Sequence, residues 1–274
     1  MSLVAFYPPF YPTPSLIDTA LAVGLNTILA AIAWIVPKKL LTPMGLAHAW
    51  FLGILVWACL GWQGYLVVMV YFLVGSAVTK IGIAQKEAEG IAEKRSGARG
   101  PENVWGSALV AAICAAGIAI SAIATPTPPW STPLITVLLL GYVASFSTKL
   151  ADTCASEIGK AYGQRTFLIT TLQPVPRGTE GAVSLEGTLA GIVAAIAIAI
   201  VGWAVGFIPP LGIPICVVAA FIATNLESVI GATLQTQWTW LTNELVNVIN
   251  TLIGAVVAIA IALIISPILI TPQV

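Results

Sequence analysis

The sequence predicts an all-α, polytopic transmembrane protein that crosses the bilayer about eight times. Of its 274 residues, 58% are hydrophobic and only 8% are charged, whereas soluble domains carry about 25% charged residues. A crossing helix needs about 20 mostly apolar residues, with a lower limit near 17, and eight stretches meet this requirement. They are 16–36, 44–61, 64–82, 104–124, 133–151, 185–207, 211–230 and 246–268. We therefore expect one integral membrane domain over residues 1–274.

Glycine and proline mark the reversals between several of these spans. A Gly-Trp-Gln-Gly turn at 61–64 separates the second span from the third, and prolines at 126–129 and 209–210 separate two later pairs. Proline lacks an amide donor and clashes with the preceding turn, so it ends a helix. The apolar segments are therefore expected to form separate helices.

The basic residues predict the orientation of the chain. All eleven Lys and Arg residues fall in three loops, after the first, third and fifth predicted spans. They are Lys38 and Lys39; Lys80, Lys86, Lys94, Arg95 and Arg99; and Lys149, Lys160, Arg165 and Arg177. Eight alternating spans place these loops on one side and both termini on the other. By the positive-inside rule the basic side is cytoplasmic, or stromal in an organelle, and both termini are non-cytoplasmic.

Composition and motifs exclude several classes of function. The net charge is zero and no block rich in Lys or Arg is present, so nucleic acid is not an expected partner. The chain has one histidine and lacks the glycine-rich phosphate loop, the dinucleotide fingerprint and the paired histidines of zinc proteases. In the segment 83–103 we interpret Lys86 to Glu93 as a solvated helix, with Gln85 and Glu89 spaced to pair.

The first polar block that could carry chemistry begins near Ser145. Ser145, Lys149, Asp152 and Ser156 lie at steps of three and four, on one stripe of a helix. Asp152 has two interpretations. It neutralises Lys149 at the membrane interface, where unpaired charges are costly, or it binds Mg²⁺. Glu157, Gly159 and Lys160 follow directly, and glycine lets backbone amides approach a phosphate.

Two further polar blocks flank later spans. The run from Pro176 precedes a membrane helix, where backbone amides attract anions; capping by Ser184, with Glu186 and Thr188, is the alternative. The later block places Asn243, Asn247 and Asn250 on one helical face. These amides join helices or line a site for a ligand headgroup. Glu227 and Glu244 have no Lys or Arg nearby in the sequence, so a cation or a distant basic residue is expected beside them.

Three blocks resemble a known membrane family. They are ADTCASEIG at 151–159, PRGTEGAVSLEGTLA at 176–190, and the polar residues within 227–250. This family contains the phytyl-phosphate kinases of tocopherol biosynthesis in plants and cyanobacteria. Asp152 through Gly163, followed by Glu186 through Thr188, is also similar to the nucleotide-binding segments of polyprenol and dolichol kinases, which use CTP. Cys154, Glu180 and Ala182 depart from the family pattern, which has Trp, Asn and Gly at these places.

The resemblance implies a kinase that moves a phosphoryl group from a nucleoside triphosphate, with CTP expected, to a membrane isoprenoid monophosphate. The expected catalytic residues are Asp152, Lys160, Arg177 and Glu186, with Asp152 and Glu186 holding Mg²⁺. The expected nucleotide contacts are Ser156, Glu157, Gly159, Gly178, Thr179, Ser184, Gly187 and Thr188. The expected acceptor contacts are Lys80, Arg99, Asn103, Glu227, Asn243, Glu244, Asn247 and Asn250. The site is expected on the cytoplasmic face of a bacterial membrane, the plasma or thylakoid membrane of a cyanobacterium, and a homo-oligomer is compatible with the sequence.

Other functions remain open at this point. A kinase for the isoprenoid alcohol, or a cytidylyltransferase, would share the nucleotide site and differ in the acceptor. A transporter of an anionic solute is the alternative from another class. It predicts ionisable groups near the membrane midplane and an internal repeat, whereas the charged groups here cluster at one interface.

Overall fold

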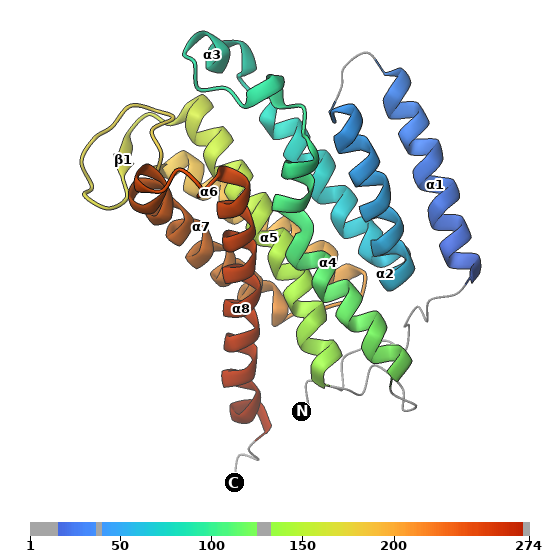
Figure 1. The fold of residues 1–274 in the computed structure, drawn as a ribbon. Coiled ribbons are helices and arrows are strands. Elements are labelled where there is room, and N and C mark those ends of the chain that lie inside the picture. The colour runs from blue at the N-terminus through green and yellow to red at the C-terminus, as the bar shows by residue number, and fades with distance from the viewer. Residues whose placement is uncertain (1–15, 37–39, 125–132, 271–274) are drawn as a thin grey trace.

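The computed structural model describes residues 16–36, 40–124 and 133–270. Long helices form a bundle, and the short elements gather at one end of it (Figure 1). Seven described helices are long and apolar enough to cross a membrane. They are α1 (Leu16–Ile35), α2 (Pro43–Thr79), α4 (Pro101–Ala124), α5 (Pro133–Tyr162), α6 (Leu185–Ala204), α7 (Gly212–Gln237) and α8 (Asn243–Ile270). The predicted all-α membrane fold is confirmed.

The 37-residue helix α2 contains two of the predicted spans. Gly61 has a left-handed φ of 65° and divides it into two halves. A straight helix of this length would separate its ends by about 54 Å. Instead, a Cβ on Gly45 would lie 2.3 Å from the Arg99 carbonyl oxygen, and one on Gly75 would lie 3.0 Å from the Arg99 guanidinium. Both ends of α2 therefore meet at Arg99, so α2 is a helical hairpin and the seven helices make eight passes.

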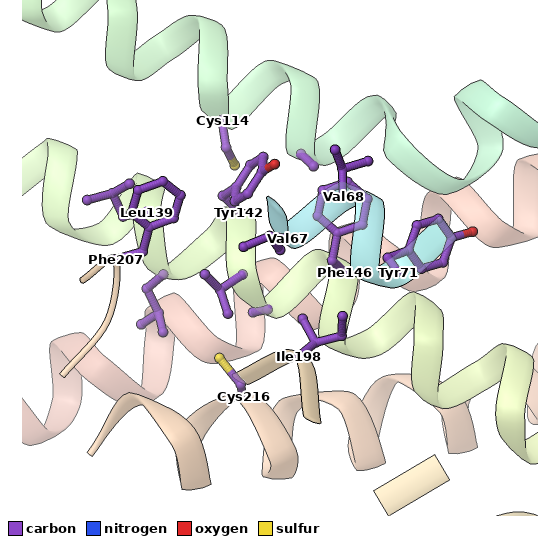
Figure 2. Close-up of a cluster of buried hydrophobic side chains, with 14 of the residues drawn as sticks. Val67, Val68, Tyr71, Cys114, Leu139, Tyr142, Phe146, Ile198, Phe207 and Cys216 are labelled. Carbon is purple, nitrogen blue, oxygen red and sulfur yellow. The ribbon is translucent and has the colours of Figure 1, made fainter. Parts of the chain in front are cut away.

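Helix α5 lies at the centre of the bundle and packs against α2, α4, α6, α7 and α8. Its Tyr142 side chain is fully buried and donates a hydrogen bond to the Gly64 carbonyl oxygen at 2.7 Å. Figure 2 shows Tyr142 among the aromatic rings of Phe146 and Phe207, which pack edge to face with it. This cluster joins α5 to the α2 hairpin and to the turn before α7.

Helix α1 is peripheral and packs against α2. Of its residues only Ala22 and Asn26 are buried. Most of its large apolar side chains are exposed, as expected for a helix that faces lipid. One side of α1 therefore covers the α2 hairpin, and the rest contacts the bilayer.

The basic end of the bundle carries the short elements α3 (Ile83–Ala88), η2 (Lys94–Gly97), β1 (Thr166–Leu168) and β2 (Ala182–Ser184). In Figure 1 α3 and β1 lie at the same end. The two strands pair antiparallel, with Thr166 opposite Ser184, and this small sheet was not predicted. Lys38, Lys39 and the predicted break at 126–129 lie outside the described residues.

The predicted solvated helix over Lys86 to Glu93 is wrong in two respects. The helix ends at Ala88, because Gly90 adopts a left-handed φ of 72°. Lys86 is fully buried, forms an ion pair with Glu157 and donates to the Thr79 carbonyl oxygen at 2.9 Å. The predicted contact from Gln85 to Glu89 is present at 2.8 Å.

The orientation of the bundle in the membrane gives a first testable prediction. Reporter fusions at Lys94 and Gln173 should read cytoplasmic, and a fusion at Pro209, in the turn between α6 and α7, should read the opposite side. By the positive-inside rule we expect the basic loops on the cytoplasmic side. A phosphatase reporter and a fluorescent-protein reporter, fused in turn at each site, measure on which side of the membrane the site lies. A cytoplasmic reading at Pro209 would contradict the assigned orientation.

Candidate functional site

A polar cluster joins α5 to α8 near the basic end. The Lys149 Nζ atom donates to the Asp152 carboxylate at 2.5 Å and to the Asn247 side-chain oxygen at 2.8 Å. The side chains of Lys149 and Asp152 are 8% and 13% exposed. A partly buried ion pair needs further hydrogen bonds to offset its desolvation, and Asn247 supplies one. The predicted pairing of Asp152 with Lys149 is therefore present, and Asn247 completes it.

Two residues from other helices interact electrostatically with this ion pair. Glu227 of α7 and Tyr71 of α2 both interact electrostatically with Lys149, and Glu227 also interacts with Asp152. Lys149 is thus a distant basic residue that interacts with Glu227, as the sequence led us to expect, although the two form no ion pair in the described part of the chain. We call Lys149, Asp152, Glu227 and Asn247 the polar cluster; three helices contribute to it.

The structure does not bring the two predicted metal ligands together. Glu186 accepts a hydrogen bond from the Gln164 backbone nitrogen at 3.4 Å, just beyond the end of α5 at Tyr162. Asp152 lies ten residues before that end, about 15 Å along the helix axis. Glu227, rather than Glu186, is the carboxylate that interacts electrostatically with Asp152.

The carboxylates of the polar cluster fit Mg²⁺ only in part. Across the described ranges, no group of three or more His, Cys, Asp or Glu residues is arranged to hold a metal. Mg²⁺ commonly uses one or two carboxylates together with substrate phosphates and water. Asp152 and Glu227 match this smaller donor set.

Several predicted nucleotide contacts hold α6 against α5. Ser184 caps α6, because its hydroxyl accepts from the Gly187 backbone nitrogen at 3.1 Å, and Thr188 donates to the Ser184 carbonyl oxygen at 2.8 Å. A Cβ on Gly187 would lie 2.5 Å from the Ala155 carbonyl oxygen, and one on Gly159 would lie 3.3 Å from the Ser184 hydroxyl. The capping interpretation is confirmed for Ser184, whereas Glu186 accepts a hydrogen bond from Gln164 instead. The glycines permit close helix packing.

Lys160 on α5 and Arg177 in the loop that follows it form ion pairs with carboxylates of the segment after α2. Lys160 lies 3.7 Å from Glu157 and 3.9 Å from Glu93, and Arg177 pairs with Glu89 at 2.7 Å. A nucleotide phosphate would have to compete with these carboxylates for Lys160 and Arg177. Glu157 does not fit its predicted nucleotide role, because its side chain is 2% exposed and enclosed by Lys86.

The other predicted nucleotide contacts, on α5 and in the loop after Arg177, lie on the surface. Ser156 donates to the Thr153 carbonyl oxygen at 3.1 Å. Gly178 has a left-handed φ of 80°, and the Thr179 hydroxyl donates to the Pro176 carbonyl oxygen at 2.8 Å. Gly178 and Thr179 thus form a tight turn beside Arg177. Whether this turn receives phosphate stays a prediction.

A large apolar cavity lies between α1, both halves of α2 and the start of α4. Its volume is about 680 Å³, within the range of ligand sites. Apolar side chains such as Leu29, Leu46, Val68, Met69 and Phe72 line it. Arg99 and Asn103 lie at its basic end, and Asn26 and Tyr65 lie deeper along it. The shape and lining suit an amphiphile with a long apolar tail.

Arg99 is the cation at the mouth of this cavity. It donates to the Tyr71 hydroxyl at 2.7 Å and lies 5.4 Å from the centre of the Tyr71 ring. Among the described residues no carboxylate forms an ion pair with Arg99. The adjacent carboxylate, Glu102, pairs with Arg95 instead. A guanidinium without a carboxylate partner is well suited to bind an anionic headgroup.

The predicted acceptor contacts separate into two groups. Arg99 and Asn103 border the cavity, and Asn103 also accepts from Arg95 at 3.1 Å. Glu227 and Asn247 belong to the polar cluster. Tyr71 lies between the groups, because its hydroxyl accepts from Arg99 and it interacts electrostatically with Lys149. Tyr71 was not predicted as a site residue, because an isolated tyrosine in an apolar span has no distinguishing pattern.

Four predicted acceptor contacts lie outside both groups. Asn243 accepts from the Gln235 side chain, and the Glu244 backbone packs against Gly106 of α4. Lys80 forms the C-terminal cap of α2. Asn250 is fully buried, and neither of its amide atoms has a hydrogen-bond partner among the described residues. The Asn243 contact joins α8 to α7 and favours helix packing over contact with a headgroup, whereas the contacts of Asn250 favour neither role.

Comparison with known proteins places the chain in a family. The family model for the integral membrane protein DUF92 matches residues 26–255. An uncharacterized membrane protein of Synechocystis is 67% identical over 240 residues, which cover 88% of this chain and 90% of that protein. An uncharacterized membrane protein of Methanocaldococcus jannaschii is 30% identical over 209 residues, 76% of this chain and 79% of that protein.

A plant protein is also similar. The protein VTE6, chloroplastic, of Arabidopsis thaliana is 46% identical over 228 residues, which cover 80% of this chain and 64% of the plant protein. The chain thus matches less than two thirds of the plant protein's length. No solved structure matches this chain significantly. The resemblance to the family of the phytyl-phosphate kinases, which the three polar blocks indicated, is confirmed. The chain belongs to the integral membrane protein family DUF92.

Proposed function

We propose that this protein is a membrane kinase that phosphorylates an isoprenoid monophosphate, such as phytyl phosphate, to the diphosphate, with CTP as the donor. The observation that carries the proposal is the apolar cavity with Arg99 at its mouth. An isoprenoid tail fits the cavity, and its phosphate fits the Arg99 guanidinium, which pairs with no carboxylate of the described residues. The resemblance to phytyl-phosphate kinases and the 46% identity to VTE6 support the same substrate class.

The reaction itself needs few groups from the protein. An oxygen of the acceptor phosphate forms a bond to the γ-phosphorus, and the bond from that phosphorus to the bridging oxygen breaks, releasing the nucleoside diphosphate. No general base is needed, since the attacking oxygen is already anionic. Catalysis of phosphoryl transfer rests mainly on positioning and on neutralising charge.

The polar cluster is the proposed centre of charge neutralisation. Asp152 and Glu227 would hold Mg²⁺, which would supply positive charge to the donor phosphates. Lys149 bonds to Asp152 and interacts electrostatically with Tyr71, whose hydroxyl accepts from Arg99 on the acceptor side. Lys160 and Arg177, on the same basic end, are proposed to bind the nucleotide phosphates after exchanging their carboxylate partners. The membrane is proposed to be the cyanobacterial plasma or thylakoid membrane, with the site on its cytoplasmic face.

One assay tests the reaction and its acceptor. Purified protein in detergent is incubated with Mg²⁺, labelled CTP, ATP, GTP or UTP, and either phytol or phytyl phosphate. We expect labelled diphosphate from phytyl phosphate and CTP, and little product from phytol, because Arg99 is placed for a headgroup that already carries negative charge. A higher rate with phytol would replace this proposal with an alcohol kinase. Release of pyrophosphate with transfer of the cytidylyl group would indicate a cytidylyltransferase.

A further inference from the structure

The deep end of the cavity is closed by a polar pair. The Asn26 side-chain oxygen accepts from the Tyr65 hydroxyl at 3.0 Å, and its nitrogen donates to the Ala22 carbonyl oxygen at 2.9 Å. Both side chains are buried. A Cβ on Gly53 would lie 2.1 Å from the Asn26 oxygen, so the amide fills the space that the glycine leaves. Asn26, Tyr65 and Gly53 therefore come from three helical passes and meet in one place, which we call the cavity floor.

The depth of the cavity follows from the helices that line it. On α1 the lining extends from Asn26 to Val36, and on the first half of α2 from Pro43 to Gly53. Ten residues of helix correspond to about 15 Å. The hydrocarbon core of a bilayer is about 30 Å thick, so the cavity reaches from the basic interface to about the middle of the membrane.

An apolar tail meets a barrier at this floor. To pass it, the tail would have to separate Asn26 from Tyr65 and leave buried polar atoms without partners, which is unfavourable. The apolar walls above the floor offer no such obstacle. A headgroup bound at Arg99, at the opposite end, would limit how far the tail can extend along the cavity.

We propose that the cavity floor limits the length of the isoprenoid tail that this protein accepts. This inference rests on the proposed function for the identity of the ligand as an isoprenoid monophosphate. Tails that reach about the middle of the bilayer fit, and long polyprenyl tails do not. The floor thereby separates the substrates of this protein from those of kinases that act on dolichol-length lipids.

Two neighbouring alanines provide a matched test. Ala30 lines the cavity one helical turn above Asn26, whereas Ala31 lies outside the lining and is exposed to lipid. Ala30→Leu raises the floor, and Ala31→Leu adds the same atoms on the lipid side. Ala30→Val is a smaller step at the same position. Thermal unfolding in detergent verifies that the variants are folded.

The measurement is binding of radiolabelled phytyl phosphate without nucleotide, in competition with geranyl, farnesyl and undecaprenyl monophosphates. In the unmodified protein, undecaprenyl phosphate should compete at least about tenfold more weakly than phytyl phosphate. Ala30→Leu should weaken the binding of phytyl phosphate about tenfold relative to the binding of farnesyl phosphate, because added atoms overfill a packed apolar site. Ala30→Val should give a smaller shift in the same direction, and Ala31→Leu none.

The outcomes separate this inference from the proposed function. The inference that the cavity floor limits tail length would be overturned if undecaprenyl phosphate competed as well as phytyl phosphate. It would also be overturned if Ala30→Leu and Ala31→Leu had the same preference for tail length, even if phosphoryl transfer is observed. A length profile that shifts as expected in a protein that transfers no phosphoryl group would support the floor and overturn the kinase proposal.

Discussion

Replacing Asp152 with asparagine should lower phosphoryl transfer to below about one hundredth of the unmodified rate at every Mg²⁺ concentration. Mutation of residues that only support a metal ligand already lowers metal affinity or activity about 10- to 100-fold. Asp152→Asn removes the charge of a proposed ligand itself and keeps the side-chain volume. The measurement is initial rate against Mg²⁺ concentration with saturating CTP and phytyl phosphate. Thermal unfolding in detergent serves as the control for folding.

The ion pair with Lys149 offers a second explanation that the experiment must separate. If Asp152 only neutralises Lys149, Asp152→Asn leaves the partly buried Lys149 charge without its carboxylate. Removing both charges should then remove this destabilisation. The double variant Asp152→Asn with Lys149→Met would then recover folding stability and activity. If Asp152 holds the metal, the double variant stays inactive. Recovery of activity would reduce Asp152 to a structural partner of Lys149.

Local patterns in the sequence predicted much of the fold. Apolar length located the spans, and the glycines at 61–64 located the reversal inside α2, because helix-breaking chemistry is local. The i,i+3 spacing likewise predicted the contact between Lys149 and Asp152. The basic loops predicted which end of the bundle carries the charged groups.

Contacts between distant residues were beyond these patterns. Lys86 and Glu157 are 71 positions apart, and nothing in the charged segment 83–103 distinguishes Lys86 from its solvated neighbours. The cavity depends on the packing of α1, α2 and α4, so Tyr71 and Asn26 acquire roles only in three dimensions. Glu186 was paired with Asp152 by motif order, which does not show how far apart two residues lie along packed helices.

The polar groups of the membrane spans also bear on the competing transporter function. The polar cluster and Arg99 both lie toward the basic end, while the described groups near mid-membrane, such as Asn26 and Tyr65, are uncharged and bonded to each other. A transporter would place its ionisable binding groups near the midplane. This arrangement favours an enzyme that acts at one interface on a lipid held in one leaflet.

Arg99→Ala is expected to raise the KM for phytyl phosphate about tenfold to a hundredfold and to leave the KM for the nucleotide nearly unchanged. A hydrogen bond to a charged group contributes about 1.5–3 kcal/mol, which corresponds to this range. The backbone of Arg99 bonds to Leu40 and Thr42, and those bonds persist in the alanine variant. The expected loss is therefore confined to the guanidinium and its contact with Tyr71.

Arg95→Ala is the matched control, because Arg95 lies four residues earlier in the same segment and already pairs with Glu102. It should change neither KM substantially. Arg99→Lys keeps the charge but loses the planar fork of donors, so its KM for phytyl phosphate should lie between those of the unmodified protein and Arg99→Ala. An equal rise in the KM for CTP would assign Arg99 to the nucleotide. Equal effects of Arg95→Ala and Arg99→Ala would show that any loss of positive charge at this interface weakens the enzyme. That result would contradict the proposal that Arg99 binds the acceptor phosphate at the mouth of the cavity.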